Sequence, residues 1–348
     1  MESQLTAVMA GCGAISRAWL DAIRTMPDLR MVGFVDINRQ AADTRAAEYG
    51  WTGAATGTDL PVMLDATRPE LVFDCTTPDA HATVAITALE RGCHVLSEKP
   101  LADSMEDARG VLHAARRAGK LHAVIQNRRY DANIRRLEAF LATGAIGQIT
   151  WINSDFFLGA HFGGFREHMA HVLLLDMAIH TFDAARLIAK ADPVAVYCHE
   201  WNPAGSWYDR DAAAVAIFEM TRGVVYTYRG SWCAEGLNST WEGSWHIAGT
   251  QGSVYWDGAS TFRAQVVAES GAFRSTLRDV EVPSLENTEK TGGHAGVIRE
   301  FVRAVRNGAT PETAGEDNIR SLAMVFGAID SATRRARVPI DLDLPARG

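Results

Sequence analysis

The chain of 348 residues is long enough for two domains with sizeable cores, and its 47% hydrophobic and 22% charged residues are typical of a globular protein. The net charge of −8 argues against a nucleic-acid partner, because a phosphate backbone is bound by clustered lysine and arginine. No apolar run is long enough to cross a bilayer, which excludes a membrane-spanning class.

Predicted strands and helices alternate through the first third of the chain. Short apolar runs indicate buried strands at residues 5–10, 30–36, 71–77, 93–97 and 120–127. Helical spacing lies between them, at 18–26, 38–50, 79–92 and 103–119. We expect Asp79 to cap the start of the third of these helices and Gly92 to end it. This alternation predicts a parallel sheet, whose carboxyl strand ends meet at one ligand-binding crevice.

The sequence GCGAIS, residues 11–16, follows the first strand and opens the first helix. Gly11 permits a tight turn, and Gly13 allows the backbone to approach a pyrophosphate, whose charge then meets the amides of the helix N-terminus. Ser16 stands where a third glycine is usual and is small enough to keep the helix close to the strand. The position between strand and helix favours a dinucleotide site over a structural glycine turn.

An acid ends the second predicted strand. Asp36 lies where a carboxylate can accept hydrogen bonds from the adenosine ribose hydroxyls. The same carboxylate repels a 2′-phosphate, so NAD is favoured over NADP. Arg39 follows closely and weakens this preference, which leaves NADP open.

The stretch HVLSEKPLA, residues 94–102, places an acid and a lysine at the end of a predicted strand. Pro100 lacks the amide hydrogen that a strand ladder needs, so the strand ends by Lys99. One interpretation of Glu98 and Lys99 is a solvated ion pair. The other is a lysine at the ligand crevice, where a partly desolvated ammonium holds a reacting oxygen and helps to move its proton.

The pattern changes after residue 127. We expect a helix at 135–147 and then long strand-rich runs, which predict an antiparallel meander at 148–159, 193–203, 213–233, 239–258 and 261–269. Helices at 170–190, 294–308 and 316–335 complete this part. The predicted domains are therefore residues 1–126 and residues 127–348. Seven of the nine tryptophans lie in the second domain, and we expect most in its core or at a subunit interface and the rest as platforms for sugar rings. Among these we expect Trp241 and Trp245 to lie together, and Tyr226, Tyr228 and Trp232 to share one face.

Asp176 and His180 are four residues apart in the apolar run LLLDMAIH, so on a helix they share a face. Such a buried pair is a satisfied core pair, a pair of metal ligands or a catalytic pair. His161, His168 and His171 lie nearby, but no H-E-x-x-H pattern or cysteine partner is present, and we predict no metal site.

The chain resembles the glucose–fructose oxidoreductase/inositol dehydrogenase (Gfo/Idh/MocA) family in GCGAIS, in TTPDAHATVAITALERGCHVLSEKPLA and in DMAIH. The resemblance implies an α/β Rossmann dinucleotide-binding domain followed by an α+β domain with a large, open-faced, mostly antiparallel sheet. It also implies catalysis by Lys99, Asp176 and His180, with His180 as general base and Asp176 as its electrostatic support, and a Lys99–Pro100 bond that is often cis. One departure is Ala170-His171-Val172, where the family commonly has glycines, so His171 is a candidate to enter the pocket.

Two sets of binding residues follow from the motifs and the resemblance. The substrate set is Lys99, Arg166, His171, Asp176 and His180. The helix residue His81 is weighed evenly between cofactor contact and packing. The complete cofactor set is Gly11, Cys12, Gly13, Ala14, Ile15, Asp36, Arg39, Thr76, Thr77, Pro78, His81, Glu98, Lys99 and Asn127.

The resemblance implies an NAD-dependent oxidoreductase that transfers hydride between nicotinamide and a secondary alcohol of a sugar, polyol or glycoside. One alternative is a glycoside-cleaving enzyme that retains NAD and uses transient oxidation. The other is a dinucleotide-bound regulator, against which the retention of Lys99 and His180 argues. We expect a homo-oligomer, a dimer or tetramer, because an open-faced aromatic sheet exposes a large apolar patch. Five scattered cysteines and a start without a basic region favour reduced thiols and the cytoplasm.

Overall fold

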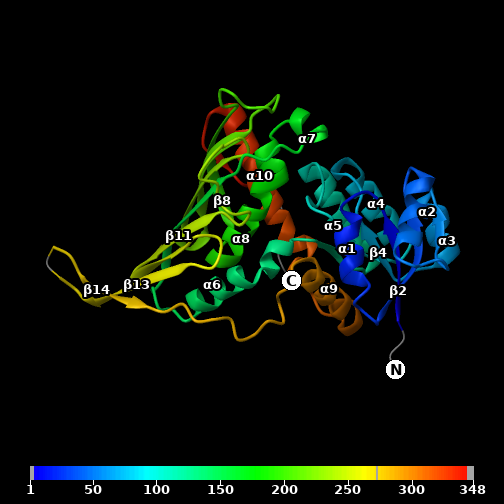
Figure 1. Cartoon of the computed structure of the whole chain (residues 1–348), viewed down its shortest axis with the longest axis horizontal. Coiled ribbons are helices and arrows are strands. Elements are labelled where there is room, and N and C mark those ends of the chain that lie inside the picture. The colour runs from blue at the N-terminus through cyan, green and yellow to red at the C-terminus, as the bar shows by residue number, and fades with distance from the viewer. Residues whose placement is uncertain (1–3, 272, 343–348) are drawn as a thin grey trace. The chain divides into compact units, whose positions relative to one another are not determined.

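The computed structural model describes residues 4–271 and 273–342, which form two compact units (Figure 1). The first unit comprises the residues up to Tyr130 together with Glu289–Ile319, and the second comprises Asp131–Thr288 and the residues from Arg320 onward. None of the helices in these ranges is both long and apolar enough to cross a membrane.

The first unit contains a six-stranded parallel sheet with the order β3-β2-β1-β4-β5-β6. This confirms the predicted parallel α/β architecture, and the order reverses between β1 and β4, where ligands bind in such sheets. The sequence prediction missed β3 and α3. The elements are β1 Leu5–Ala10, α1 Ser16–Ile23, β2 Leu29–Val35, α2 Arg39–Glu48, β3 Ala55–Gly57, α3 Leu60–Thr67, β4 Leu71–Asp74, α4 Pro78–Glu90, β5 His94–Ser97, α5 Met105–Ala118, β6 His122–Val124, η1 Asn127–Tyr130 and α9 His294–Asn307.

Side-chain caps explain where several of these helices begin. The Ser104 side chain accepts a hydrogen bond from Asp107 N at the start of α5, and the Asn38 side chain accepts one from Gln40 N at the start of α2. The prediction that Asp79 caps α4 is wrong. Thr77 is the cap residue and Pro78 is the first helical residue, because the fixed φ of proline and its missing N–H suit that position.

The observed units differ from the predicted domain boundary at residues 289–319, which belong to the first unit. The reason is α9, whose apolar face joins the core of that unit. Val297, Ile298 and Phe301 are buried in one cluster with Trp19 and Leu20 of α1. Burial of this face fixes a late segment against the first domain, a long-range contact that helical spacing alone cannot reveal.

The second unit contains a nine-stranded sheet with the order β14-β13-β12-β11-β7-β10-β9-β8-β15. It is mostly antiparallel, as predicted, but it is not a simple meander, because β10 pairs parallel with β7. The elements are α6 Ala132–Ala142, β7 Ile149–Phe157, α7 Phe165–His168, η2 Leu173–Ala178, α8 Ile179–Ala189, β8 Pro193–Trp201, β9 Ala213–Met220, η3 Thr221–Gly223, β10 Val225–Ser231, β11 Ser244–Gly249, β12 Gly252–Trp256, β13 Phe262–Glu269, β14 Thr276–Val280, α10 Gly315–Arg334, which begins in the first unit, and β15 Val338–Pro339.

The two faces of this sheet differ in how far their large apolar side chains are buried. On one face, the ring of Phe182 from α8 packs edge-on against Phe218, Tyr226 and Tyr228, all fully buried. The prediction that Tyr226 and Tyr228 share one face is confirmed, and Trp232, which follows the end of β10, is buried as well. Large apolar side chains remain exposed at alternating positions of the other face, among them Trp151, Tyr197, Trp201, Val215, Ile217, Val225 and Tyr255.

Candidate active site

The loop after β1 has the shape that a dinucleotide requires. Gly11 has φ +84°, and a Cβ at this position would lie 2.5 Å from the carbonyl carbon and oxygen of Cys75, so only glycine fits. A Cβ on Gly13 would meet open space, and Gly13, Ala14 and Ile15 are exposed. No side chain caps the N-terminus of α1, where Arg17 N and Ala18 N donate to the carbonyls of Ala14 and Ile15 at 3.3 and 3.0 Å.

Two polar side chains donate hydrogen bonds to the backbone carbonyls of this loop. The hydroxyl of Ser16 donates to the carbonyl of Gly13 at 2.7 Å, so the residue that replaces the third glycine is buried and bonded. Nη2 of Arg45 donates to the carbonyls of Cys12 and Gly13, each at 3.0 Å. Sequence reasoning missed Arg45. The only local signal was an arginine within an alanine-rich helix, and its burial becomes apparent only in the fold.

The Asp36 side chain accepts hydrogen bonds from backbone amides that follow β1 and β2. Its carboxylate accepts hydrogen bonds from Cys12 N and Asn38 N, each at 2.8 Å. Arg39, which was expected to weaken the preference for NAD, is exposed and forms its ion pair with Asp43 at 3.0 Å. Asp36 therefore lies beside the glycine loop, and its charge is not neutralised by the nearest arginine along the chain.

The turn after β4 is fixed by a buried acid. The amide and hydroxyl of Thr76 donate to Oδ1 of Asp74, at 3.1 and 2.6 Å, and burial raises the pKa of this carboxyl. His81 is fully buried, with Nδ1 2.7 Å from the carbonyl oxygen of Pro100 and Nε2 3.1 Å from that of Thr76. Because both ring nitrogens face backbone carbonyls, these contacts support the packing interpretation of His81, which connects two loops of the crevice.

Glu98 is a buried carboxylate, so the interpretation as a solvated ion pair is wrong for this residue. Trp19 Nε1 donates to its Oε1 at 2.8 Å, and the amide of Lys99 donates to its Oε2 at 3.1 Å. Burial acts to raise the pKa of Glu98, but His294 at 3.9 Å, Trp19 and the Lys99 charge outweigh it and hold the pKa below its usual value. Glu98 therefore stays ionised and fixes the backbone that carries Lys99.

Lys99 is partly buried at the end of β5, and the Lys99–Pro100 peptide bond is cis, as the resemblance implied. Asn127 follows β6 and opens η1. The predicted residues Gly11–Ile15, Asp36, Thr76–Pro78, Glu98, Lys99 and Asn127 thus follow the carboxyl ends of β1, β2, β4, β5 and β6, on one edge of the sheet.

In the second unit, Asp176 binds Arg166. Nε of Arg166 donates to Oδ2 of Asp176 at 2.8 Å and Nη2 to Oδ1 at 3.4 Å, a two-pronged contact that the spacing argument did not predict. Asp176 lies in the π-helical segment η2, so the helix predicted over 170–190 is present but is not α-helical there. His180 lies in the first turn of α8 and is partly buried. Single π-helical turns of this kind are frequent at functional sites.

The histidines considered as metal ligands have different partners. His161 contacts Glu235 at 3.0 Å, and His168 contacts Asp209 at 2.6 Å. His171 contacts Glu200 at 2.5 Å and has φ +53°, a conformation that is uncommon outside glycine. The fold therefore does not bring His161, His168 and His171 into one cluster.

Aromatic rings surround the Arg166 guanidinium. Its central carbon lies 5.1 Å from the ring centre of Phe162 and 4.8 Å from that of Phe165. Phe162 and Trp241 also pack against Trp232. The prediction that Trp241 and Trp245 lie together is wrong, because Trp241 is exposed in a turn whereas Trp245 is buried in β11. This aromatic cluster offers flat apolar faces next to the Arg166–Asp176 pair.

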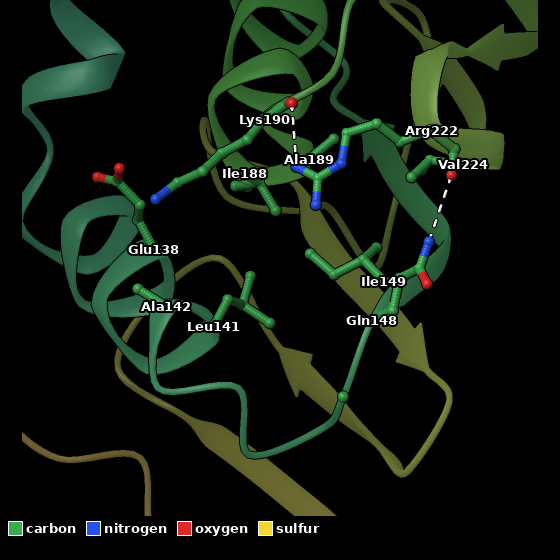
Figure 2. A pocket seen from close by; sticks show the side chains of 11 residues that line it. Glu138, Leu141, Ala142, Gln148, Ile149, Ile188, Ala189, Lys190, Arg222 and Val224 are labelled. Atoms are coloured by element: carbon green, nitrogen blue, oxygen red, sulfur yellow. Dashed lines mark hydrogen bonds between the residues drawn. The ribbon is translucent and has the colours of Figure 1, made fainter.

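A surface pocket on the second unit lies apart from the predicted site residues. Figure 2 shows Glu138 and Leu141 of α6, Lys190 at the end of α8, and Gln148 and Arg222 around it. Its polar contacts are local, such as Arg222 Nη1 donating to the Lys190 carbonyl at 3.4 Å. None of the predicted catalytic or binding residues lines this pocket, so it is not the candidate active site.

Comparisons with known proteins show which family the chain belongs to. Residues 5–126 match the family described as "Oxidoreductase family, NAD-binding Rossmann fold", and residues 134–255 match the GFO/IDH/MocA C-terminal domain. The chain is 23% identical to the 1,5-anhydro-D-fructose reductase of Ensifer adhaerens, over 97% of this chain and 98% of that protein. It is also 23% identical to the inositol 2-dehydrogenase of Rhizobium meliloti, over 95% and 98%.

A solved oxidoreductase from Agrobacterium radiobacter, in complex with NAD⁺, L-tartaric acid and magnesium, has the same fold. Its TM-score is 0.84 at 20% identity, covering 97% of this chain and 99% of that one. The chain belongs to the Gfo/Idh/MocA oxidoreductases, whose first domain is an NAD-binding Rossmann fold.

Proposed function

We propose that this oxidoreductase transfers hydride between NAD and a secondary alcohol of a sugar, polyol or glycoside. The observation that carries the proposal is Lys99, whose backbone is held by the buried Glu98 on the sheet edge that also bears the glycine loop. The names of the two curated relatives, a reductase of an anhydro sugar and an inositol dehydrogenase, support the substrate class.

The first unit's residues supply the binding of the cofactor. The open space at Gly13 and the uncapped start of α1 suit a pyrophosphate, and Asp36 suits the ribose hydroxyls. When bound, NAD supplies the acceptor for hydride. Because Asp36 disfavours a 2′-phosphate, we propose NAD as the preferred cofactor.

The catalytic roles follow from the chemistry of each side chain. The Lys99 ammonium stabilises negative charge that develops on the alcohol oxygen. The His180 imidazole accepts the hydroxyl proton in the direction of oxidation and returns it in the direction of reduction. The Asp176 carboxylate supports the positive imidazolium, and Arg166 fixes the orientation of Asp176 through its two-pronged contact.

A dehydrogenase screen tests this proposal. Sugars, inositols and glycosides are offered with NAD and with NADP, and formation of reduced nicotinamide is followed by absorbance. We expect turnover with at least one member of these classes and a preference for NAD. Cleavage of a glycoside without release of NADH would instead indicate the redox-neutral alternative, and binding of NAD without any turnover would indicate a regulator.

We further propose that the protein forms a homo-oligomer through the second unit's exposed sheet face. Trp151, Tyr197, Trp201 and Ile217 are each at least 37% exposed on this face, which is costly for a monomer in water. We also propose a cytoplasmic location, because all five cysteines carry free thiols.

A further inference from the structure

Three side chains from separate segments of the second unit converge at one end of β8. His171 precedes η2, Glu200 is the penultimate residue of β8, and Asp211 lies two residues before β9. One nitrogen or oxygen atom from each lies within 4.8 Å of the other two. An imidazole and two carboxylates are the donors that divalent transition metals use in proteins.

The carboxylate of Glu200 is buried, and one of its two oxygens has no hydrogen-bond partner among the described residues. Its side chain is only 2% exposed. His171 Nδ1 lies 2.5 Å from Oε2, but Oε1 is buried and has no hydrogen-bond partner among the residues that the structure describes. A carboxylate buried this deeply is costly unless both of its oxygens are paired, and a second carboxylate, that of Asp211, lies close by.

Other contacts hold the three side chains in place. His171 is fixed in a left-handed conformation, and its carbonyl accepts from Leu175 N at 2.9 Å. The loop between β8 and β9 is attached to α7 by Asp209, whose amide donates to the Glu167 carbonyl at 2.8 Å. The cluster is therefore built on a framework that does not depend on any bound ion.

We propose that His171, Glu200 and Asp211 bind one divalent transition-metal ion such as Zn²⁺ or Mn²⁺, with further coordination positions open to water. Tetrahedral ligands about 2.1 Å from an ion lie about 3.4 Å apart, so small side-chain adjustments suffice. The ion neutralises Glu200 and Asp211 and anchors the chain directly before η2. Sequence reasoning did not predict this site, because His171 and Glu200 are 29 positions apart and the spacing matches no metal motif.

Metal titration of the untagged, chelator-treated full chain tests the proposal. We expect one ion per chain by elemental analysis after incubation with Zn²⁺ or Mn²⁺ and desalting, and saturable binding by calorimetry. Asp211→Asn and Glu200→Gln should each lower affinity by more than the roughly 10–100-fold that loss of an outer partner of a ligand costs. His113→Asn, which alters an exposed histidine on α5 of the first unit, should bind as the unmodified protein does.

The melting temperature provides a second readout and controls for misfolding. Zn²⁺ or Mn²⁺ should raise it for the unmodified protein and for His113→Asn, but not for Asp211→Asn, whose side chain is only partly buried and whose fold should persist. The proposal is overturned if the unmodified protein binds neither ion, or if folded Asp211→Asn binds either ion as tightly as the unmodified protein. Because these readouts need no substrate, their failure is separate from failure of the proposed function.

Discussion

The indole Nε1 of Trp19 lies 2.8 Å from Oε1 of Glu98, 79 residues later in the chain. The other carboxylate oxygen of Glu98 accepts from the Lys99 amide. Trp19, on the helix that follows the glycine loop, thereby helps to fix the backbone of Lys99, the proposed catalytic lysine. This contact connects the cofactor loop to the end of β5 through one buried anion.

Trp19→Phe should therefore impair both stability and turnover. The substitution leaves a buried carboxylate oxygen with fewer donors, which should cost about 1–3 kcal/mol of unfolding free energy. We expect kcat to fall as well, because the Lys99 backbone loses part of its support. Denaturant unfolding and steady-state kinetics measure the two effects. Unchanged values of both would show that the contact matters for neither.

Arg45→Met should weaken cofactor binding more than it slows the reaction. Arg45 donates to two carbonyls of the glycine loop and to the Glu48 carboxylate, so its loss should loosen the loop. We expect the KM for NAD to rise about 10-fold while kcat changes little, the pattern of lost uniform binding. Arg17→Met, which removes an exposed partner of the same Glu48, is the matched control. Equal effects of the two substitutions would contradict a specific role for Arg45.

Asp36→Ser should shift the cofactor preference toward NADP. The change removes both the repulsion of a 2′-phosphate and the acceptor for ribose hydroxyls. The ratio of kcat/KM for NADP to that for NAD should rise about 10-fold or more. Asp21→Ser, an exposed acid on α1, should leave the ratio unchanged. A preference of the unmodified protein for NADP would show that Arg39, despite its pairing with Asp43, controls the selection.

Ile217→Lys should dissociate the proposed oligomer. Ile217 is 45% exposed on the open sheet face, so a lysine there costs little in a monomer but places a charge inside a buried interface. Light scattering after gel filtration should show a dimer or larger for the unmodified protein and a smaller species for the variant. Val62→Lys, on the exposed side of α3, is the control. A monomeric unmodified protein would refute the assembly.

The sequence predicted the parts of the structure that depend on local pattern. The strand Leu5–Ala10 and the glycine turn behind it follow from residue type and spacing alone. The contacts that build the site span long distances in sequence, such as Arg45 to Cys12, Trp19 to Glu98 and α9 to α1. Periodicity cannot reveal such pairs, because many buried arrangements share one hydrophobic pattern. The π-helical segment also escaped prediction, since its residues are apolar and compatible with an α-helix.

The central claim is that Lys99 and His180 serve one chemical step, and kinetics of Lys99→Ala, His180→Ala and the double variant test it most directly. Each single substitution should lower kcat on the order of 100-fold or more, with NAD affinity and melting temperature nearly unchanged. The double variant should lose less than the product of the two losses, because both side chains act on one proton transfer. Lys120→Ala, before β6, should behave as the unmodified protein. Near-normal turnover of folded Lys99→Ala, or fully multiplicative losses in the double variant, would contradict the account.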